Sequence, residues 1–200
     1  MMTDPKINSI LDEGNRLFLQ RNFEQAIEYY DKILDEDPKH ISSLNNKGYA
    51  LSKIKDFTNA IKCYDIALKI CPDDLSVLIN KISSFRKQGN LIEALLICDN
   101  ILKNNKNYNI ALYHKERILF SMGKFNESIS CCNSILEDYP DNGDVLFDKA
   151  SNSAMLSNFD DALNLLEHAI SQGIQYKIKA KKSKSFENLF DNIRFQNLIS

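Results

Sequence analysis

The sequence repeats itself with a period of 34 residues, and this period constrains the fold more than any other feature. Pro38 and Pro72 are one period apart, and Pro140 follows after two more periods. Lysine, an aromatic residue or leucine, and a small residue recur at the same spacing. These three columns are Lys47, Lys81, Lys115 and Lys149; Phe23, Phe57, Leu91, Phe125 and Phe159; and Ala26, Ala60, Ala94, Ser128 and Ala162. They predict five units, at residues 7–40, 41–74, 75–108, 109–142 and 143–174.

Each unit carries two stretches with apolar residues at helical spacing, which predicts two amphipathic helices. In the second unit the first stretch places Leu44, Gly48 and Leu51 on one stripe, and the second stretch begins at Phe57. Pro72 ends that second helix, because proline has no amide donor. A helix pair this short cannot bury its apolar stripes alone. We therefore expect an all-α fold in which neighbouring units stack into one continuous core.

The two most regular units carry the residues of a known repeat motif. They are Gly14, Leu17, Phe23, Ala26, Tyr30, Ile33 and Pro38 in the first unit, and Leu44, Gly48, Leu51, Phe57, Ala60, Tyr64, Ala67 and Pro72 in the second. The pattern resembles the tetratricopeptide repeat over roughly residues 7–174. This resemblance implies a right-handed α-solenoid of tandem helix-turn-helix repeats that acts as a non-catalytic protein-interaction scaffold.

The later units depart from the motif. The position of Gly14 and Gly48 is taken by Ile82 in the third unit and by Glu116 in the fourth. A large side chain there holds two helix axes apart, so we expect looser packing near Glu116. The lysine column stands where the motif often has a bulky apolar residue, and we expect the lysine stems to lie along the helix pair.

Residues 175–200 differ from the repeats in charge and pattern. They carry a net charge of +4, whereas residues 1–174 carry −6. Apolar residues from Phe186 to Ile199 follow helical spacing, and a stack of repeats needs a terminal element to cover its last apolar face. We therefore expect a basic segment followed by a C-terminal capping helix. The alternative is a nucleic-acid-associated adaptor, in which the lysines of this segment contact RNA phosphates.

The sequence carries none of the common signatures of catalysis, so we expect no enzyme and no cofactor. The five cysteines are an odd number with no Cys-x-x-Cys pair, which argues against a disulfide framework or a zinc site. His40, His114 and His168 fall at different positions of the unit, so we expect no metal site. No apolar stretch is long enough for a membrane span, and the first residues lack an apolar signal core. We expect a cytoplasmic protein without membrane contact.

One stripe of each first helix lies opposite the stripe that faces the helix pair. The tetratricopeptide resemblance implies that this stripe lines a concave groove. Apolar, aromatic and amide side chains occupy it, and we predict that they bind a peptide segment of a partner protein. The predicted groove residues are Leu11, Asn15, Asn45, Asn46, Tyr49, Ile79, Asn80, Ser83, Tyr113, His114, Arg117 and Phe147. The alternative for Leu11, Ile79, Tyr113 and Phe147 is that the adjacent first helix covers them.

The resemblance also argues against one kind of partner. Family members that hold chaperone tails clamp the terminal carboxylate with two lysines, an arginine and two asparagines. At the matching positions this chain has Leu11, Asn15, Asn46, Ser76 and Asn80, so both amides are present and all three cations are missing. We expect a protein partner other than a chaperone C-terminal tail, and no nucleic acid. An accessory subunit of an enzyme complex would carry the same sequence features.

Overall fold

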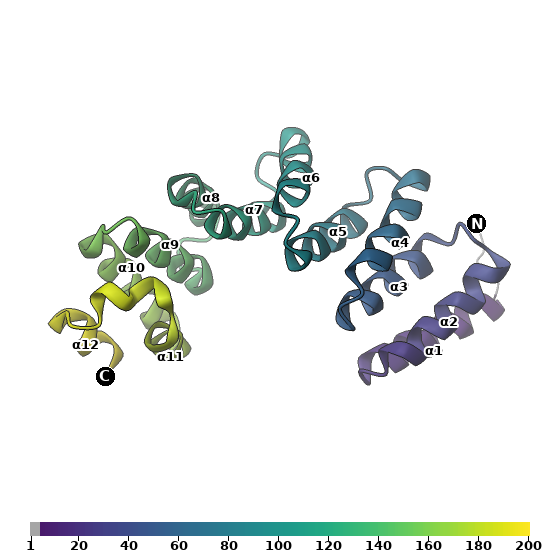
Figure 1. Cartoon of the computed structure of the whole chain (residues 1–200), viewed down its shortest axis with the longest axis horizontal. Coiled ribbons are helices and arrows are strands. Elements are labelled where there is room, and N and C mark those ends of the chain that lie inside the picture. Colours follow the sequence, from purple (N-terminus) through teal and green to yellow (C-terminus); the bar gives the residue numbers. More distant parts are fainter. Residues whose placement is uncertain (1–4) are drawn as a thin grey trace. The chain divides into compact units, whose positions relative to one another are not determined.

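The computed structural model describes residues 5–200, which form twelve α-helices and one 3₁₀ helix, η1, with no β-strand among them (Figure 1). In the first half these are α1 Pro5–Leu19, α2 Phe23–Glu36, α3 Ile41–Lys53, α4 Phe57–Ile70, α5 Leu75–Gln88 and α6 Leu91–Asn104. In the second half they are α7 Asn109–Ser121, α8 Phe125–Asp138, α9 Gly143–Met155, α10 Phe159–Gln172, α11 Gln175–Lys182, η1 Lys184–Leu189 and α12 Ile193–Ile199. The prediction of an all-α fold built from tandem helix pairs is confirmed.

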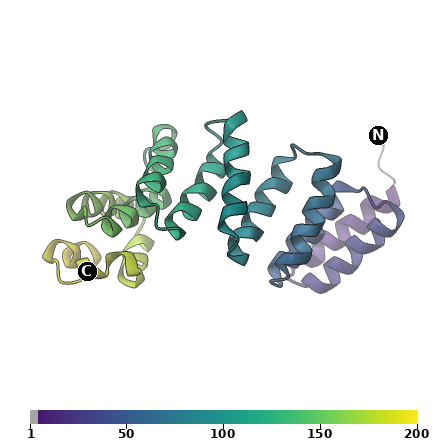
Figure 2. The ribbon, with the colours of Figure 1, turned by 45° about the horizontal axis from the view of Figure 1, so that its top comes forward.

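The chain divides into two compact units, one ending at Ile97 and the other beginning at Cys98. Within the first unit, each helix from α1 to α4 packs against the next one, and α3 also contacts α1 and α5 (Figure 2). Within the second unit, α7 to α10 pack in the same consecutive manner. The division into five repeats and a cap at the stated residues stays a prediction.

The residue at the end of one repeat caps the first helix of the next. The side chains of His40, Asp74 and Asn142 each accept a hydrogen bond from the backbone N–H three residues later, at 3.1–3.2 Å. These residues and Tyr108 form one column of the 34-residue period, and Tyr108 has no such side-chain bond. A side-chain acceptor at this position binds one of the backbone N–H groups that have no partner within the first turn of a helix. The residue type at this position therefore marks where the first helix of the next repeat begins.

Glycine and tyrosine meet where the two helices of a repeat cross. A Cβ atom on Gly14 would lie 2.8 Å from Cε1 of Tyr30, and one on Gly48 would lie 2.6 Å from Cε1 of Tyr64. Both tyrosines are buried. Each glycine therefore makes room for the ring of the facing helix, which explains why the two residue types recur together.

The lysine column forms ion pairs that link successive helix pairs. Lys47 contacts Asp31, Lys81 contacts Asp65 at 2.6 Å, and Lys115 contacts Asp99 at 2.6 Å. In each pair the aspartate lies on the second helix of one repeat, and the lysine lies on the first helix of the next. We call these pairs the Lys–Asp ladder. The lysines are partly buried, so their stems lie along the helices while their ammonium groups reach an acid.

Four of the five cysteines are buried, and the fifth, Cys71, is half-buried. Burial raises the pKa of the Cys98 thiol to about 12 and that of the Cys131 thiol to about 11, because the thiolate would lose its hydration. The pKa values of Cys63 and Cys132 are raised for the same reason. These four cysteines act as small core residues.

Glu116 occupies a buried position, and the expected looser packing around it is wrong. Its side chain is 2 % exposed. Its Oε1 accepts from the hydroxyl of Ser128 at 3.0 Å and from the amide of Asn152 at 3.3 Å. Burial and the neighbouring carboxylate of Asp148 raise the pKa of Glu116 to about 7. The Glu116 side chain is thus enclosed, and hydrogen bonds from α8 and α9 hold it at the position that glycine occupies in the first two repeats.

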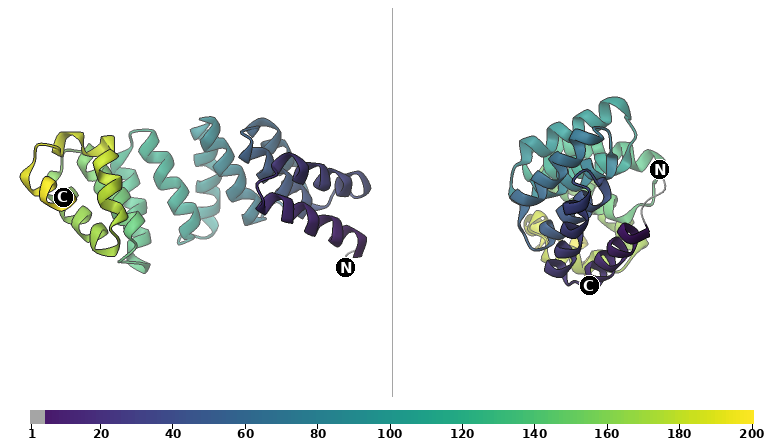
Figure 3. Two further views of the ribbon diagram at one scale, coloured as in Figure 1. Left: turned by 90° about the horizontal axis from the view of Figure 1, so that it is seen from below. Right: turned by 90° about the vertical axis from the view of Figure 1, so that its right-hand side faces the viewer.

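The C-terminal segment packs on the last helix pair (Figure 3). Phe147 of α9 stacks on Tyr176 of α11 with ring centroids 5.8 Å apart, and its ring edge meets Phe186 of η1 at 5.7 Å. Phe186 in turn stacks on Phe195 of α12 at 5.7 Å. These rings belong to a core that also contains Leu163 and other residues of α9 and α10.

Candidate functional site

A pocket of about 310 Å³ opens in the first unit between α1 and α3. It is lined by Asn15, Phe18 and Leu19 of α1, Tyr30 of α2, and Asn46 and Tyr49 of α3. The pocket thus brings together three predicted groove residues, Asn15, Asn46 and Tyr49. We call it the α1–α3 pocket.

Aromatic rings form the walls of the α1–α3 pocket. Phe18 and Tyr49 stack with their centroids 5.1 Å apart and an interplanar angle of 29°. Tyr49 remains 37 % exposed, and Leu19 at the edge of the pocket is 81 % exposed. Apolar surface left open beside stacked rings favours the insertion of an apolar group from a ligand.

A hydrogen-bond network forms the polar part of the pocket. The hydroxyl of Tyr30 donates to Oδ1 of Asn15 at 3.0 Å, and the amide of Asn46 donates to the same oxygen at 2.9 Å. Desolvation of the buried phenol raises the pKa of Tyr30 to about 12, so the hydroxyl stays protonated as a donor. The two asparagines are therefore held in fixed orientations by neighbouring helices.

A second amide pair lies one repeat further along. The amide of Asn80 donates to Oδ1 of Asn45 at 2.9 Å, and the amide of Asn45 donates to the hydroxyl of Ser76 at 3.1 Å. These bonds connect α3 with α5. The predicted groove residues Leu11, Ile79 and Ser83 are half-buried and do not line the α1–α3 pocket.

Predicted residues of the second unit form a separate group. The guanidinium of Arg117 lies over the ring of Tyr113, 4.2 Å from its centroid, and also donates to the tyrosine hydroxyl. Arg117 further pairs with Asp148 at 3.5 Å. Tyr113 lines a pocket of about 280 Å³ together with Tyr139 and five other residues of α7, α8 and α9 or of the turn before α9. His114 is half-buried and engaged in a contact of its own.

The prediction that Phe147 faces a groove is wrong. Its side chain is 9 % exposed, because the rings of Tyr176 and Phe186 cover it. Phe147 is covered by neighbouring helices, as the alternative for this residue stated. The covering helices are α11 and η1 of the C-terminal segment, and not an adjacent first helix.

Comparison with known proteins addresses the family directly. One model of the tetratricopeptide repeat matches residues 41–74, and a second model of this repeat matches residues 17–40. Residues 17–74 are tetratricopeptide repeats. No curated protein matches its sequence at a significant level.

Solved structures of tetratricopeptide repeat proteins share the fold of this chain at low sequence identity. YrrB, described as a TPR protein with an unusual peptide-binding site, is 20 % identical with a TM-score of 0.69, over 87 % of this chain and 91 % of YrrB. MamA is 18 % identical with a TM-score of 0.72, over 88 % of this chain and 96 % of MamA. A tetratricopeptide repeat protein from Parabacteroides merdae is 16 % identical with a TM-score of 0.83, over 98 % of this chain and 78 % of that protein.

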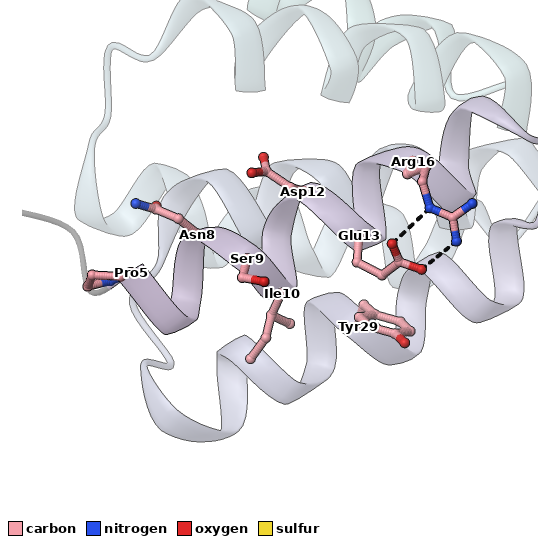
Figure 4. Close-up of a pocket in the computed structure, with 8 residues that line it drawn as sticks. All are labelled: Pro5, Asn8, Ser9, Ile10, Asp12, Glu13, Arg16 and Tyr29. Carbon is pink, nitrogen blue, oxygen red and sulfur yellow. Dashed lines mark hydrogen bonds and ion pairs between the residues drawn. The ribbon is translucent and has the colours of Figure 1, made fainter.

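A wider hollow of about 730 Å³ lies along α1 of the repeat protein (Figure 4). Its central polar groups already bind each other, since Arg16 donates to both carboxylate oxygens of Glu13 at 2.5 and 2.8 Å. This pairing lowers the pKa of Glu13. Because Arg16 and Glu13 are paired with each other, Asp12 is the charged residue of this lining that forms no ion pair among residues 5–200, and we do not assign a binding site here.

The basic segment of the repeat protein directs part of its charge toward nearby acids. Lys179 pairs with Asp144 at 2.7 Å, and Arg194 pairs with Glu167 at 2.9 Å. The ammonium of Lys177 donates to the backbone carbonyl of Ser200 at 2.9 Å. These contacts agree better with a segment that leans on the helices than with a surface reserved for RNA phosphates.

Residues 5–200 contain no cluster of three or more His, Cys, Asp or Glu side chains placed to hold a metal ion. Over the same range, no helix combines the length and the apolar composition that crossing a membrane requires. The cytoplasmic location stays a prediction.

Sequence reasoning missed Phe18, Leu19 and Tyr30 as lining residues of the α1–α3 pocket. Phe18 and Leu19 stand at the twelfth and thirteenth positions of the repeat, on the outward stripe of α1. The signal was an aromatic and a leucine side by side at positions where a helix facing solvent carries polar residues. Tyr30 is a motif residue of the first unit, and the structure buries it with its hydroxyl at the pocket.

Proposed function

We propose that this protein is a non-catalytic interaction scaffold that binds a peptide segment of a partner protein on the outward stripe of its first helices. Tetratricopeptide repeats and proteins of this fold serve protein–protein interaction rather than catalysis. YrrB, a protein of the same fold, is described as having an unusual peptide-binding site, which supports this class of ligand here.

The observation that carries the proposal is the α1–α3 pocket. Its aromatic walls offer an apolar contact, and its two oriented asparagines offer hydrogen bonds at the same place. A peptide is the ligand class that presents apolar side chains and backbone amides together. Because neighbouring helices already hold the asparagines, little ordering is needed when the peptide binds.

The predicted groove residues of both units remain part of this proposal, with the exception of Phe147. Tyr113 beside its own pocket in the second unit is a second candidate contact. An accessory subunit of an enzyme complex would use the same binding surface, and its partner would be another subunit of that complex.

Affinity capture from the native lysate tests the proposal. The baits are the wild type, Tyr49→Ala and Phe190→Ala, each confirmed as folded by circular dichroism. Phe190 is the control, because it is an aromatic residue of similar exposure that lines neither the α1–α3 pocket nor the pocket beside Tyr113. We expect a protein that the wild type and Phe190→Ala retain and Tyr49→Ala loses. Equal retention by all three baits places the binding surface elsewhere.

A further inference from the structure

The residues in and beside the α1–α3 pocket indicate the chemistry of the ligand that it binds. We propose that it binds an extended, acidic peptide segment, with one large apolar side chain in the pocket and a carboxylate within about two residues that pairs with Lys53. This inference rests on the proposed function and specifies the chemistry of the partner.

The size of the pocket limits what can enter it. Its volume of about 310 Å³ lies at the low end of the range for drug-sized ligands and cofactors, about 300–1,000 Å³. The stacked rings of Phe18 and Tyr49 and the exposed side chain of Leu19 provide apolar walls. The pocket has room for one leucine, methionine or phenylalanine side chain together with part of the adjoining backbone.

The polar groups of the pocket match a peptide backbone. Oδ1 of Asn15 already accepts from Tyr30 and Asn46. Among the described residues, the NH₂ group of Asn15 and the oxygen of Asn46 have no hydrogen-bond partner. One free donor and one free acceptor side by side complement the C=O and N–H of an extended chain.

A cation stands at the edge of the aromatic wall. Lys53 lies in the last turn of α3, and its ammonium group is 4.7 Å from the centroid of the Tyr49 ring. Within residues 5–200 Lys53 forms no ion pair, whereas Lys47 and Lys81 of the same unit are paired with aspartates. The cation–π contact holds Lys53 beside the pocket and leaves its positive charge available.

The position of Lys53 sets the place of the acidic residue. An extended chain advances about 3.3 Å per residue, so a carboxylate one or two residues from the buried side chain reaches an ammonium group at this distance. Asp12 lies two turns before Leu19 on α1, so an acid of the ligand is favoured at the Lys53 end of the pocket and disfavoured toward Asp12.

The test is a selection from a phage-displayed library of random dodecapeptides, with the full chain as bait. The baits are the wild type, Tyr49→Ala, Lys53→Glu and Lys69→Glu. Lys69 is the matched control, because it is also an exposed lysine in the last turn of a first-unit helix and lies outside the pocket. Selected peptides are then synthesised, and their affinities are measured by fluorescence anisotropy.

We expect wild-type peptides that share a large apolar residue with Asp or Glu one or two positions away. Tyr49→Ala weakens them at least about tenfold, as for an aromatic hot spot. Lys53→Glu weakens them about fivefold and selects Lys or Arg in place of the acid, whereas Lys69→Glu leaves affinity and selection unchanged.

The outcomes separate the two proposals. Peptides that depend on Tyr49 but show no acidic preference, or keep it in Lys53→Glu, overturn the acidic-ligand inference and leave the proposed function standing. Peptides whose binding is unaffected by Tyr49→Ala exclude the α1–α3 pocket and overturn the inference. A wild-type selection that enriches no peptide contradicts both.

Discussion

The ammonium nitrogen of Lys81 lies 2.6 Å from Oδ1 of Asp65, and the two residues come from α5 and α4, the adjoining helices of successive repeats. Lys115 and Asp99 reproduce this contact one period later at the same distance. Partly exposed ion pairs contribute little energy singly, about 0–1 kcal/mol. Repeated at three successive steps, they favour one register between the second helix of a repeat and the first helix of the next.

The Lys–Asp ladder can be extended by one step. Lys149 continues the lysine column, but Asn133 stands where an aspartate would meet it. We expect Asn133→Asp to increase the free energy of unfolding by about 0.3–1 kcal/mol, because it supplies the missing acid. Urea unfolding measures the change. The same substitution in a Lys149→Met background should give no gain, and an equal gain there would show that no fourth pair forms.

The Gly48–Tyr64 contact predicts the cost of a single methyl group. Gly48→Ala should destabilise the protein by about 1–3 kcal/mol, because the added Cβ would lie 2.6 Å from the Tyr64 ring. This loss outweighs the gain of about 0.5–1 kcal/mol that alanine gives in a helix. Thermal unfolding of a double-mutant cycle with Tyr64→Leu, which imitates Ala150 and Leu166 of the fifth repeat, checks the cause. Gly48→Ala should cost less in the Tyr64→Leu background, and an equal cost would contradict the contact.

Glu116 predicts a pH dependence of stability. Its pKa is raised from 4.5 in the unfolded chain to about 7 in the folded one, so the folded state binds the proton more tightly. Stability is therefore highest below pH 4.5 as far as this group is concerned, and falls as the pH rises from 4.5 to about 7. The full effect is at most about 3 kcal/mol, at 1.36 kcal/mol for each pKa unit.

Glu116→Gln isolates this contribution, since the amide keeps the shape of the carboxyl group and does not ionise. We expect the variant to unfold at a higher urea concentration than the wild type at pH 8 and to differ little from it at pH 5. Ser134→Ala, an exposed site on α8, serves as the control with no pH-dependent difference. A constant difference between Glu116→Gln and wild type across this range would exclude a raised Glu116 pKa.

Phe147→Ala should loosen the C-terminal segment. Removing the ring opens a cavity between Tyr176 and Phe186 and should cost about 3–5 kcal/mol. The backbone of α11 then unfolds more often, and trypsin can cleave it after its lysines. Mass spectrometry of a timed digest should therefore show earlier cleavage in α11 than in the wild type. Tyr113→Ala should leave the cleavage rate unchanged. Cleavage of Phe147→Ala at the wild-type rate would contradict the packing role of this ring.

The repeat and its helix pairs could be predicted because they rest on local periodicity. Leu44, Gly48 and Leu51 lie one turn apart, and their spacing alone predicts a buried helix face. The partners of polar residues were harder to predict. Asp31, Asp65 and Asp99 recur with the period of 34 residues, as the lysines do. Only the packing of helices such as α4 on α5 shows that these aspartates contact the lysines.

Exposure of the outward stripe could not be predicted from the sequence. Phe147 and Tyr49 occupy the same kind of helix face, yet one is 9 % exposed and the other 37 %. The difference arises because the C-terminal segment, distant in the sequence from α9, folds onto Phe147. Similarly, the sequence did not predict that the amide of Asn46 donates to Asn15. Long-range packing decides both cases.

The buried cysteines supply built-in reporters of unfolding. Cys63 lies on α4, Cys98 on α6, and the neighbours Cys131 and Cys132 on α8, so three successive repeats each conceal a thiol in the second helix. A thiol reagent added to the native protein should modify Cys71 alone at first. As repeats open one after another, the masses of the labelled fragments would record the order, because each repeat contacts chiefly its neighbours. The unmodified natural chain can thus be used for residue-resolved unfolding experiments without engineered probes.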